Sequence, residues 1–204
     1  MIRPLLWLPL TAVLLAPVLA QETSLEKRAL KLHALAGGDW CEPWGDGIGY
    51  SGEDRFASWT ITYQPSWNPD AEEETVTLIR IFCFAGAYNM VHAYYWHREY
   101  DGLQPLAFAQ PAYRTEYEND DVLEGRLLGV TVTGMGATTT LVNSEFDPET
   151  QTITSHSLWR GIGDASSSGT WQFRDGEFAL EHFEIDASYD GEGNPETVLD
   201  YRNQ

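Results

Sequence analysis

The stretch Trp59-Thr60-Ile61-Thr62-Tyr63 alternates between apolar and polar residues without a break. This period of two places every second side chain on one face, which is typical of a β-strand with one buried face. Further short segments that favour β-structure follow at intervals of roughly ten residues. They lie at 75–84, 87–96, 129–133, 138–146, 151–159, 169–173 and 178–185.

Residues that favour turns separate these segments. Proline, glycine, asparagine and aspartate gather at 68–70, 101–102, 147–150 and 174–176. Long helical patterns do not alternate with the strands, which argues against an α/β fold. The sequence therefore predicts an all-β domain, an antiparallel sandwich or a barrel-like fold, with one short N-terminal helix.

That helix is expected directly before the strands. Thr23-Ser24-Leu25-Glu26 fits a capping box, and Gly37-Gly38 is typical of a helix C-terminus. The apolar residues that fall on one face at helical spacing are Leu25, Ala29, Leu32 and Ala36.

The first twenty residues have the pattern of a secretory signal peptide. A short cationic start with Arg3 precedes an apolar run from Leu5 to Pro17, and Val18-Leu19-Ala20 precedes a polar segment. The run is too short to span a membrane comfortably. We expect cleavage near Ala20, a periplasmic or secreted location, a single β-rich domain of residues 21–204 and no membrane insertion after cleavage.

The composition of the chain narrows the classes of molecule that it could bind. The chain has 12 basic and 31 acidic residues, a net charge of −19, which repels nucleic acid and anionic lipid. Eight Trp, ten Tyr and eight Phe argue against disorder. The acidic clusters at 70–74 and 116–121 are expected to be solvated loops.

The two cysteines, Cys41 and Cys83, predict one structural disulfide in an oxidising compartment. Closing a loop of about 43 residues contributes roughly 4 kcal/mol in the chain-entropy model. A redox-active pair would more often have the spacing C-x-x-C.

Motifs for cofactors and metals do not fit. Residues 47–52 match G-x-G-x-x-G, but no strand precedes them and Glu53-Asp54 follows, so we expect a loop. His92 and His97 lie on opposite faces of a predicted strand and cannot share an ion. The acidic segment 190–194 lacks the remaining positions of a calcium loop. The sequence predicts no cofactor and no metal.

Aromatic residues remain as candidates for binding. Trp44 lies in a glycine-rich segment, and Trp96 ends an aromatic run on both faces of one strand. Exposed rings on an acidic protein suit sugars or cationic side chains, whereas buried rings would simply fill the core.

Several segments together resemble one bacterial exported family, catalogued as domain of unknown function 1176. They are Arg80-Ile81-Phe82-Cys83-Phe84-Ala85-Gly86-Ala87-Tyr88-Asn89, Leu141-Val142-Asn143-Ser144-Glu145-Phe146-Asp147-Pro148, Arg160-Gly161-Ile162-Gly163-Asp164, Thr170-Trp171-Gln172-Phe173 and Phe178-Ala179-Leu180, within roughly residues 75–185. The resemblance implies export and a mainly β domain, and it implies no activity. The cysteine that the family usually carries after G-D is Ala165 here, so Cys83 is expected to pair with Cys41 instead.

The physical content of these motifs adds further candidates. Gly86 before Tyr88 fits a bulge or a close backbone approach, and Asn89 can hold an adjoining turn. Arg160 and Asp164 can pair, either as a structural clasp or in a ligand site. The candidate binding residues are therefore Trp44, Tyr88, Asn89, Trp96, Arg160 and Asp164.

Three functions remain open. The leading hypothesis is a non-enzymatic binding domain for an envelope protein or glycan. Its sharper form is an inhibitor of a basic enzyme such as lysozyme, since opposite charge would steer the encounter. The alternatives are a hydrolase with dispersed carboxylates or histidines and a purely structural envelope protein.

Overall fold

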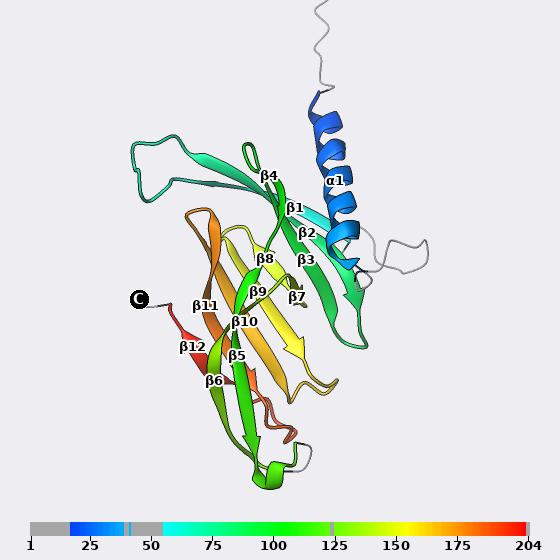
Figure 1. Cartoon of the computed structure of the whole chain (residues 1–204), viewed down its shortest axis with the longest axis vertical. Helices are drawn as coiled ribbons and strands as arrows, with labels where there is room; N and C mark the ends of the chain where they lie inside the picture. Colours follow the sequence, from blue (N-terminus) through cyan, green and yellow to red (C-terminus); the bar gives the residue numbers. More distant parts are fainter. Residues whose placement is uncertain (1–16, 39–40, 42–54, 123–124, 203–204) are drawn as a thin grey trace, which may run out of the picture.

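A computed structural model describes residues 17–38, 41, 55–122 and 125–202 (Figure 1). One helix, α1 (Pro17–Ala36), precedes a series of antiparallel strands, so the predicted all-β fold with an N-terminal helix is confirmed. The strands are β1 (Phe56–Tyr63), β2 (Glu74–Ala85), β3 (Met90–Arg98), β4 (Gly102–Pro105), β5 (Phe108–Tyr117), β6 (Leu127–Thr138), β7 (Thr140–Val142), β8 (Glu145–Asp147), β9 (Thr152–Leu158), β10 (Ser166–Arg174), β11 (Glu177–Asp186) and β12 (Glu196–Asp200).

The strands form two five-stranded sheets and one two-stranded ribbon. The first sheet has the order β1-β2-β3-β4, and β7 pairs with the other half of the same edge of β3. The second sheet has the order β12-β11-β10-β9-β8. The β5–β6 ribbon forms a separate pair whose β5 contacts β11 of the second sheet.

The two sheets pack face to face, and α1 covers the outer face of the first sheet (Figure 1). Alternation along β2 explains this layering, because Leu78 joins the core between the sheets and Ile79 packs against the helix. Tyr94 and Tyr95 divide in the same way on β3. Both central strands are therefore buried on both faces, as their continuous apolar sequence requires.

The hairpin turn between β10 and β11 closes one end of the sandwich. Asp175 and Gly176 both have positive φ, at 49° and 88°, which is typical of a type I′ turn. The Asp175 carboxylate accepts hydrogen bonds from the backbone N–H and hydroxyl of Ser66, and Arg98 donates to the Gly176 carbonyl. The turn predicted at 174–176 therefore also ties the two sheets together.

Several predicted boundaries differ from the structure, and the largest differences are at the helix start and at 138–146. The helix starts at Pro17 rather than at the Thr23 capping box, and proline is compatible with this first helical position because it loses no internal hydrogen bond there. The strand predicted at 138–146 is divided into the end of β6, β7 and β8, with Asn143 at a positive φ of 43° between the last two. Residues 1–16 of the predicted signal peptide and the loop at 47–52 lie outside the described residues. Among the residues described, α1 included, no helix has the length and apolar character needed to cross a membrane.

Candidate functional site

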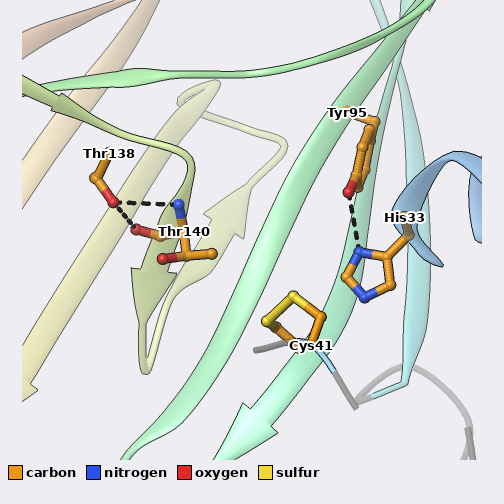
Figure 2. Close-up of a disulfide and its surroundings, with 6 residues drawn as sticks. His33, Cys41, Tyr95, Thr138 and Thr140 are labelled. Atoms are coloured by element: carbon orange, nitrogen blue, oxygen red, sulfur yellow. Dashed lines mark hydrogen bonds between the residues drawn. A yellow bond between two sulfur atoms is a disulfide. The ribbon is translucent and has the colours of Figure 1, made fainter. Parts of the chain in front are cut away.

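The disulfide between Cys41 and Cys83 is present, as predicted (Figure 2). Both cysteines are buried, and with Val91 they form a small core near the start of β3. Next to it, the Tyr95 hydroxyl and Nδ1 of His33 share a hydrogen bond of 2.9 Å between the first sheet and α1 (Figure 2). Burial lowers the pKa of His33, so this contact holds a neutral imidazole. The disulfide thus anchors the chain after α1 to β2, three residues before Gly86 of the recognised motif.

Two asparagine side chains join the sheets at this end of the molecule. Asn89 donates from Nδ2 to the Leu158 carbonyl at 2.7 Å and accepts from the Leu158 N–H at 3.1 Å. Asn143 accepts from the Met90 N–H at 2.7 Å, and it donates to Asn89 Oδ1 and to the His156 carbonyl, both at 3.0 Å. The two amides therefore link the β2–β3 turn, the β7–β8 corner and β9 in one network.

The residue after Asn143 extends the network into the core. The Tyr94 hydroxyl donates to Ser144 Oγ at 3.0 Å, and Arg80 Nη1 donates to the Ser144 carbonyl at 2.8 Å. Burial raises the pKa of Tyr94, so its hydroxyl stays protonated and remains a donor. The β7–β8 corner is held from both sides by these bonds.

The loop between β9 and β10 is closed by Arg160 and Asp164. Arg160 donates from Nε to Asp164 Oδ1 at 2.5 Å and from Nη2 to Oδ2, which is a two-pronged pair. The same Nη2 reaches the Tyr189 carbonyl at 2.7 Å, and the Gly191 N–H donates to Asp164 Oδ2 at 2.8 Å. The Asp164 side chain is only 2% exposed. The guanidinium of Arg160 lowers the pKa of Asp164 to about 2, so this carboxylate stays ionised at neutral pH.

Aromatic side chains surround this pair. Trp159 stacks on Tyr113 with ring centroids 6.2 Å apart and planes 3° apart, and it also contacts Tyr189. The Tyr88 ring lies over Gly161, where a Cβ atom would come within 3.2 Å of it. Tyr88 and the neighbouring Ile162 stay on the surface, at 43% and 73% exposure. We call this region the motif end, and it consists of Tyr88, Asn89, Asn143, Trp159, Arg160, Gly161, Ile162, Asp164 and Tyr189.

The structure brings four of the six candidate residues together. Tyr88, Asn89, Arg160 and Asp164 all lie in the motif end, joined through Gly161 and Leu158. Asn143 and Tyr189 also belong to it and were not among the candidates. Asn143 lies inside a recognised motif, so the motif itself was the available signal, whereas nothing in the sequence marks Tyr189.

Trp96 is a correction to the candidate list. It is buried between the sheets, stacked on Phe178 at 6.0 Å with Arg98 over its ring at 4.4 Å. Its inward position on β3 gives the ring a role in packing and removes it from any surface site. Trp44 lies outside the described residues.

A cavity of about 520 Å³ lies beside the disulfide and is lined partly by Tyr95, Pro105 and Thr140, and none of the candidate binding residues that the structure describes lines it. Among the residues the structure describes, no group of three or more His, Cys, Asp or Glu is placed to hold a metal ion. The motif end is therefore the place where the candidate residues meet.

The bonding in the motif end fixes a shape. The Asp164 carboxylate is ionised and shared between Arg160 and the Gly191 N–H, and both amides are engaged with backbone groups. Such groups hold a surface in one conformation, and the side chains of Tyr88 and Ile162 remain exposed on it.

The motif end falls within the range of a known family model. The model described as "Protein of unknown function (DUF1176)" matches residues 72–192, which contain every residue of the motif end. No curated protein and no solved structure matches the chain.

Proposed function

The chain belongs to the DUF1176 family of proteins of unknown function, and we propose that the motif end is the recognition surface of an exported binding domain. Its partner on this proposal is a glycan or a protein of the cell envelope. The observation that carries the proposal is the exposure of Tyr88 and Ile162 on a frame whose polar groups bond to one another. A preorganised surface loses little conformational entropy on binding, so a few apolar side chains suffice for recognition.

The position of Tyr88 supports recognition more than packing. One side of its ring rests on Gly161, while 43% of the residue remains in solvent. Arg160 and Asp164 hold the loop under the ring, and Asn89 holds the turn that carries it. Tyrosine is favoured at binding surfaces because it has a large rigid ring and a polar tip.

Export is part of the same proposal. The signal-like pattern of residues 1–20 and the disulfide both suit an oxidising compartment, either periplasmic or extracellular. Expression of the whole chain in an exporting bacterium tests this directly. We expect the processed protein to begin near Gln21 by mass spectrometry and to contain no free thiol.

The recognition surface is tested with a paired substitution. The Tyr88→Ser and Ile162→Ser double variant removes both exposed apolar groups. The control is Trp67→Ser with Tyr100→Ser, two exposed side chains outside the motif end. Each protein is incubated separately with purified peptidoglycan and with immobilised envelope proteins. We expect the control to bind one of them as the wild type does, and the Tyr88/Ile162 variant to lose at least about tenfold in affinity. Equal binding by both variants, or no binding by the wild type, would reject the motif end as a recognition surface.

The charge of the chain favours a second candidate, an inhibitor of a basic enzyme. At a net charge of −19, association with a cationic enzyme would be fast at low salt and slower at high salt. Lysozyme activity measured with the purified chain at 20 mM and 300 mM salt tests this, and no inhibition at either salt would remove the candidate.

A further inference from the structure

A cavity of about 190 Å³ lies between β7, the β5–β6 ribbon and the second sheet. Strands β9 and β10 line it with Ser155, Ser157 and Ser167, and β5 lines it with Gln110. No residue of the motif end lines this cavity, so it is a separate place on the molecule.

The serines of this cavity stand where a β-sandwich normally has apolar side chains. Along β9, Ser155 and Ser157 share the face of Ile153, which belongs to the core between the sheets. Along β10, Ser167 shares the face of the core residue Trp171, and it lies directly opposite Ser157. Polar residues at positions that face the core break the binary pattern of a strand, and such exceptions are expected at functional sites.

Three of the polar groups in the cavity have no hydrogen-bond partner in the part of the chain that the structure describes. They are the hydroxyls of Ser157 and Ser167 and the side-chain amide of Gln110. Ser155 differs, because its hydroxyl donates to the Val142 carbonyl at 2.8 Å and accepts from the Val142 N–H at 3.2 Å. The three groups without a partner are half-buried, so they stay accessible to a small molecule in the cavity.

Trp171 forms an apolar wall of the same cavity. A Cβ atom on Gly169 would overlap the Trp171 ring, so glycine is what allows the ring to lie over this strand. The indole N–H donates to the Ala109 carbonyl at 2.8 Å, which fixes the ring against β5. The cavity therefore combines a rigid apolar wall with polar groups that can both donate and accept hydrogen bonds.

The described lining of the cavity contains no charged side chain, in a chain with 31 acidic and 12 basic residues. An ionised ligand would lose water there without meeting an opposite charge, which is costly. The cavity therefore favours a neutral ligand that has both hydroxyl and C–H groups.

We infer that this cavity binds one neutral sugar ring. The hydroxyl groups of a pyranose donate and accept as serine and glutamine side chains do, and its C–H groups suit the wall of Trp171. A cavity of about 150 Å³ holds one benzene ring, so a cavity of about 190 Å³ lined by half-buried side chains has room for one ring and not for two.

Saturation-transfer NMR with the exported chain tests the inference. Glucose, galactose and mannose are titrated separately to about 50 mM. At least one of them is expected to bind with a dissociation constant of about 0.1–10 mM, because a single ring makes few contacts.

Ser157→Ala combined with Ser167→Ala removes two hydroxyls without breaking a hydrogen bond that the structure describes. We expect this double variant to weaken sugar binding at least about tenfold. The matched control is Thr154→Val with Thr170→Val, which removes two hydroxyls that lie opposite one another on the other face of the same two strands. The control is expected to bind the sugar as the wild type does.

Gln110→Leu is a second cavity variant, which removes the amide and keeps a side chain of similar size. It is also expected to weaken binding, and thermal unfolding checks that every variant keeps the wild-type fold. A wild type that binds none of the three sugars overturns the inference, and so does binding that both cavity variants leave unchanged.

The Tyr88→Ser and Ile162→Ser double variant separates this site from the motif end. It is expected to bind the sugar as the wild type does, so failure of the cavity and failure of the motif end appear in different variants. Loss of sugar binding in this variant would place the sugar at the motif end and overturn the inference.

Discussion

The motif end and the β5–β6 ribbon belong to the same β-fold, but different hydrogen bonds hold the backbone of each. At the motif end, side chains such as Asn143 and Asp164 bond to backbone groups of other segments and leave irregular chain in one conformation. In the ribbon, backbone pairing between β5 and β6 holds the conformation, and the side chains of β6 are mainly exposed. Side-chain hydrogen bonding is therefore concentrated where the strands stop being regular.

The energetic consequence is a large difference in sensitivity to mutation. A buried bonding group that loses its partner costs its full desolvation energy, whereas an exposed group finds water instead. Substitutions at the motif end should therefore destabilise the fold far more than substitutions of similar size on β6. Four predictions test this difference.

The largest effect is expected for the disulfide beside the motif end. Replacing both Cys41 and Cys83 by alanine removes a cross-link between positions 42 residues apart, which leaves the unfolded chain less restricted. We expect the free energy of unfolding to fall by about 4 kcal/mol, measured by urea denaturation. Thr133→Ala on β6 is the control and should change it by less than about 0.5 kcal/mol. A loss below about 1 kcal/mol in the cysteine variant would show that the motif end does not depend on this anchor.

Asn143→Ala should have the next largest effect. It leaves the Met90 N–H and the His156 carbonyl without their partner, and it places alanine at a φ of 43°. We expect a loss of about 3 kcal/mol. Asn143→Gly separates the two causes, because glycine accepts the backbone angle and lacks only the hydrogen bonds. If the glycine variant is as stable as the wild type, backbone strain alone explains the effect of alanine.

The regular strands and the tight turn could be predicted from the sequence, whereas the irregular segments at the motif end could not. Alternation of apolar and polar residues predicts strands such as β1, and the residue types of Asp175-Gly176 predict a turn. The division of 138–146 at Asn143 was hidden, because its cause is a set of partners far away in the chain, Met90 and His156 among them.

Strands β5 and β12 were also missed. β5 contains Pro111 and the charged residues Arg114 and Glu116, which break the alternation of a strand. β5 pairs through one edge only among the described residues, and a proline is tolerated where no ladder bond is needed. β12 is short and begins and ends on acidic residues, so its sequence resembles a loop.

The candidate site shows the same limit. The motifs contain Tyr88, Asn89, Arg160 and Asp164, which lie together in the structure, but sequence spacing gives no distance between residues 88 and 160. Trp96 was misplaced because an aromatic run on both faces of a strand does not reveal that both faces are covered.

The third prediction concerns pH. The pKa of Asp164 is lowered to about 2 from 3.8 by the hydrogen bonds from Arg160, so folding favours its ionised form. The resulting stability is fully present above the unfolded pKa of 3.8 and is lost as pH falls toward 2. The difference in unfolding free energy between wild type and Asp164→Asn should therefore shrink between pH 5 and pH 2. Thr131→Asp, an added carboxylate on exposed β6, should show no such change relative to wild type. A pH-independent difference for Asp164→Asn would mean that the ionised carboxylate is not what holds the loop.

The smallest effect separates the two regions at matched glycines. Gly161→Ala brings a methyl group within 3.2 Å of the Tyr88 ring, while Gly134→Ala on β6 meets no atom within 4 Å. The ring must move by a few tenths of an ångström, so we expect Gly161→Ala to cost about 1 kcal/mol. Gly134→Ala should be neutral or stabilise by up to about 1 kcal/mol, because alanine restricts the unfolded chain more than glycine does.

Tyrosine fluorescence cannot isolate Tyr88 among ten tyrosines, so the ring is followed by NMR of selectively labelled tyrosine. A shift of the Tyr88 signal in Gly161→Ala and none in Gly134→Ala would show that the loop sets the position of the exposed ring. If Gly161→Ala is as stable as Gly134→Ala and the signal does not move, the ring is not held against Gly161, and the rigid frame proposed for the motif end loses its main contact with the surface.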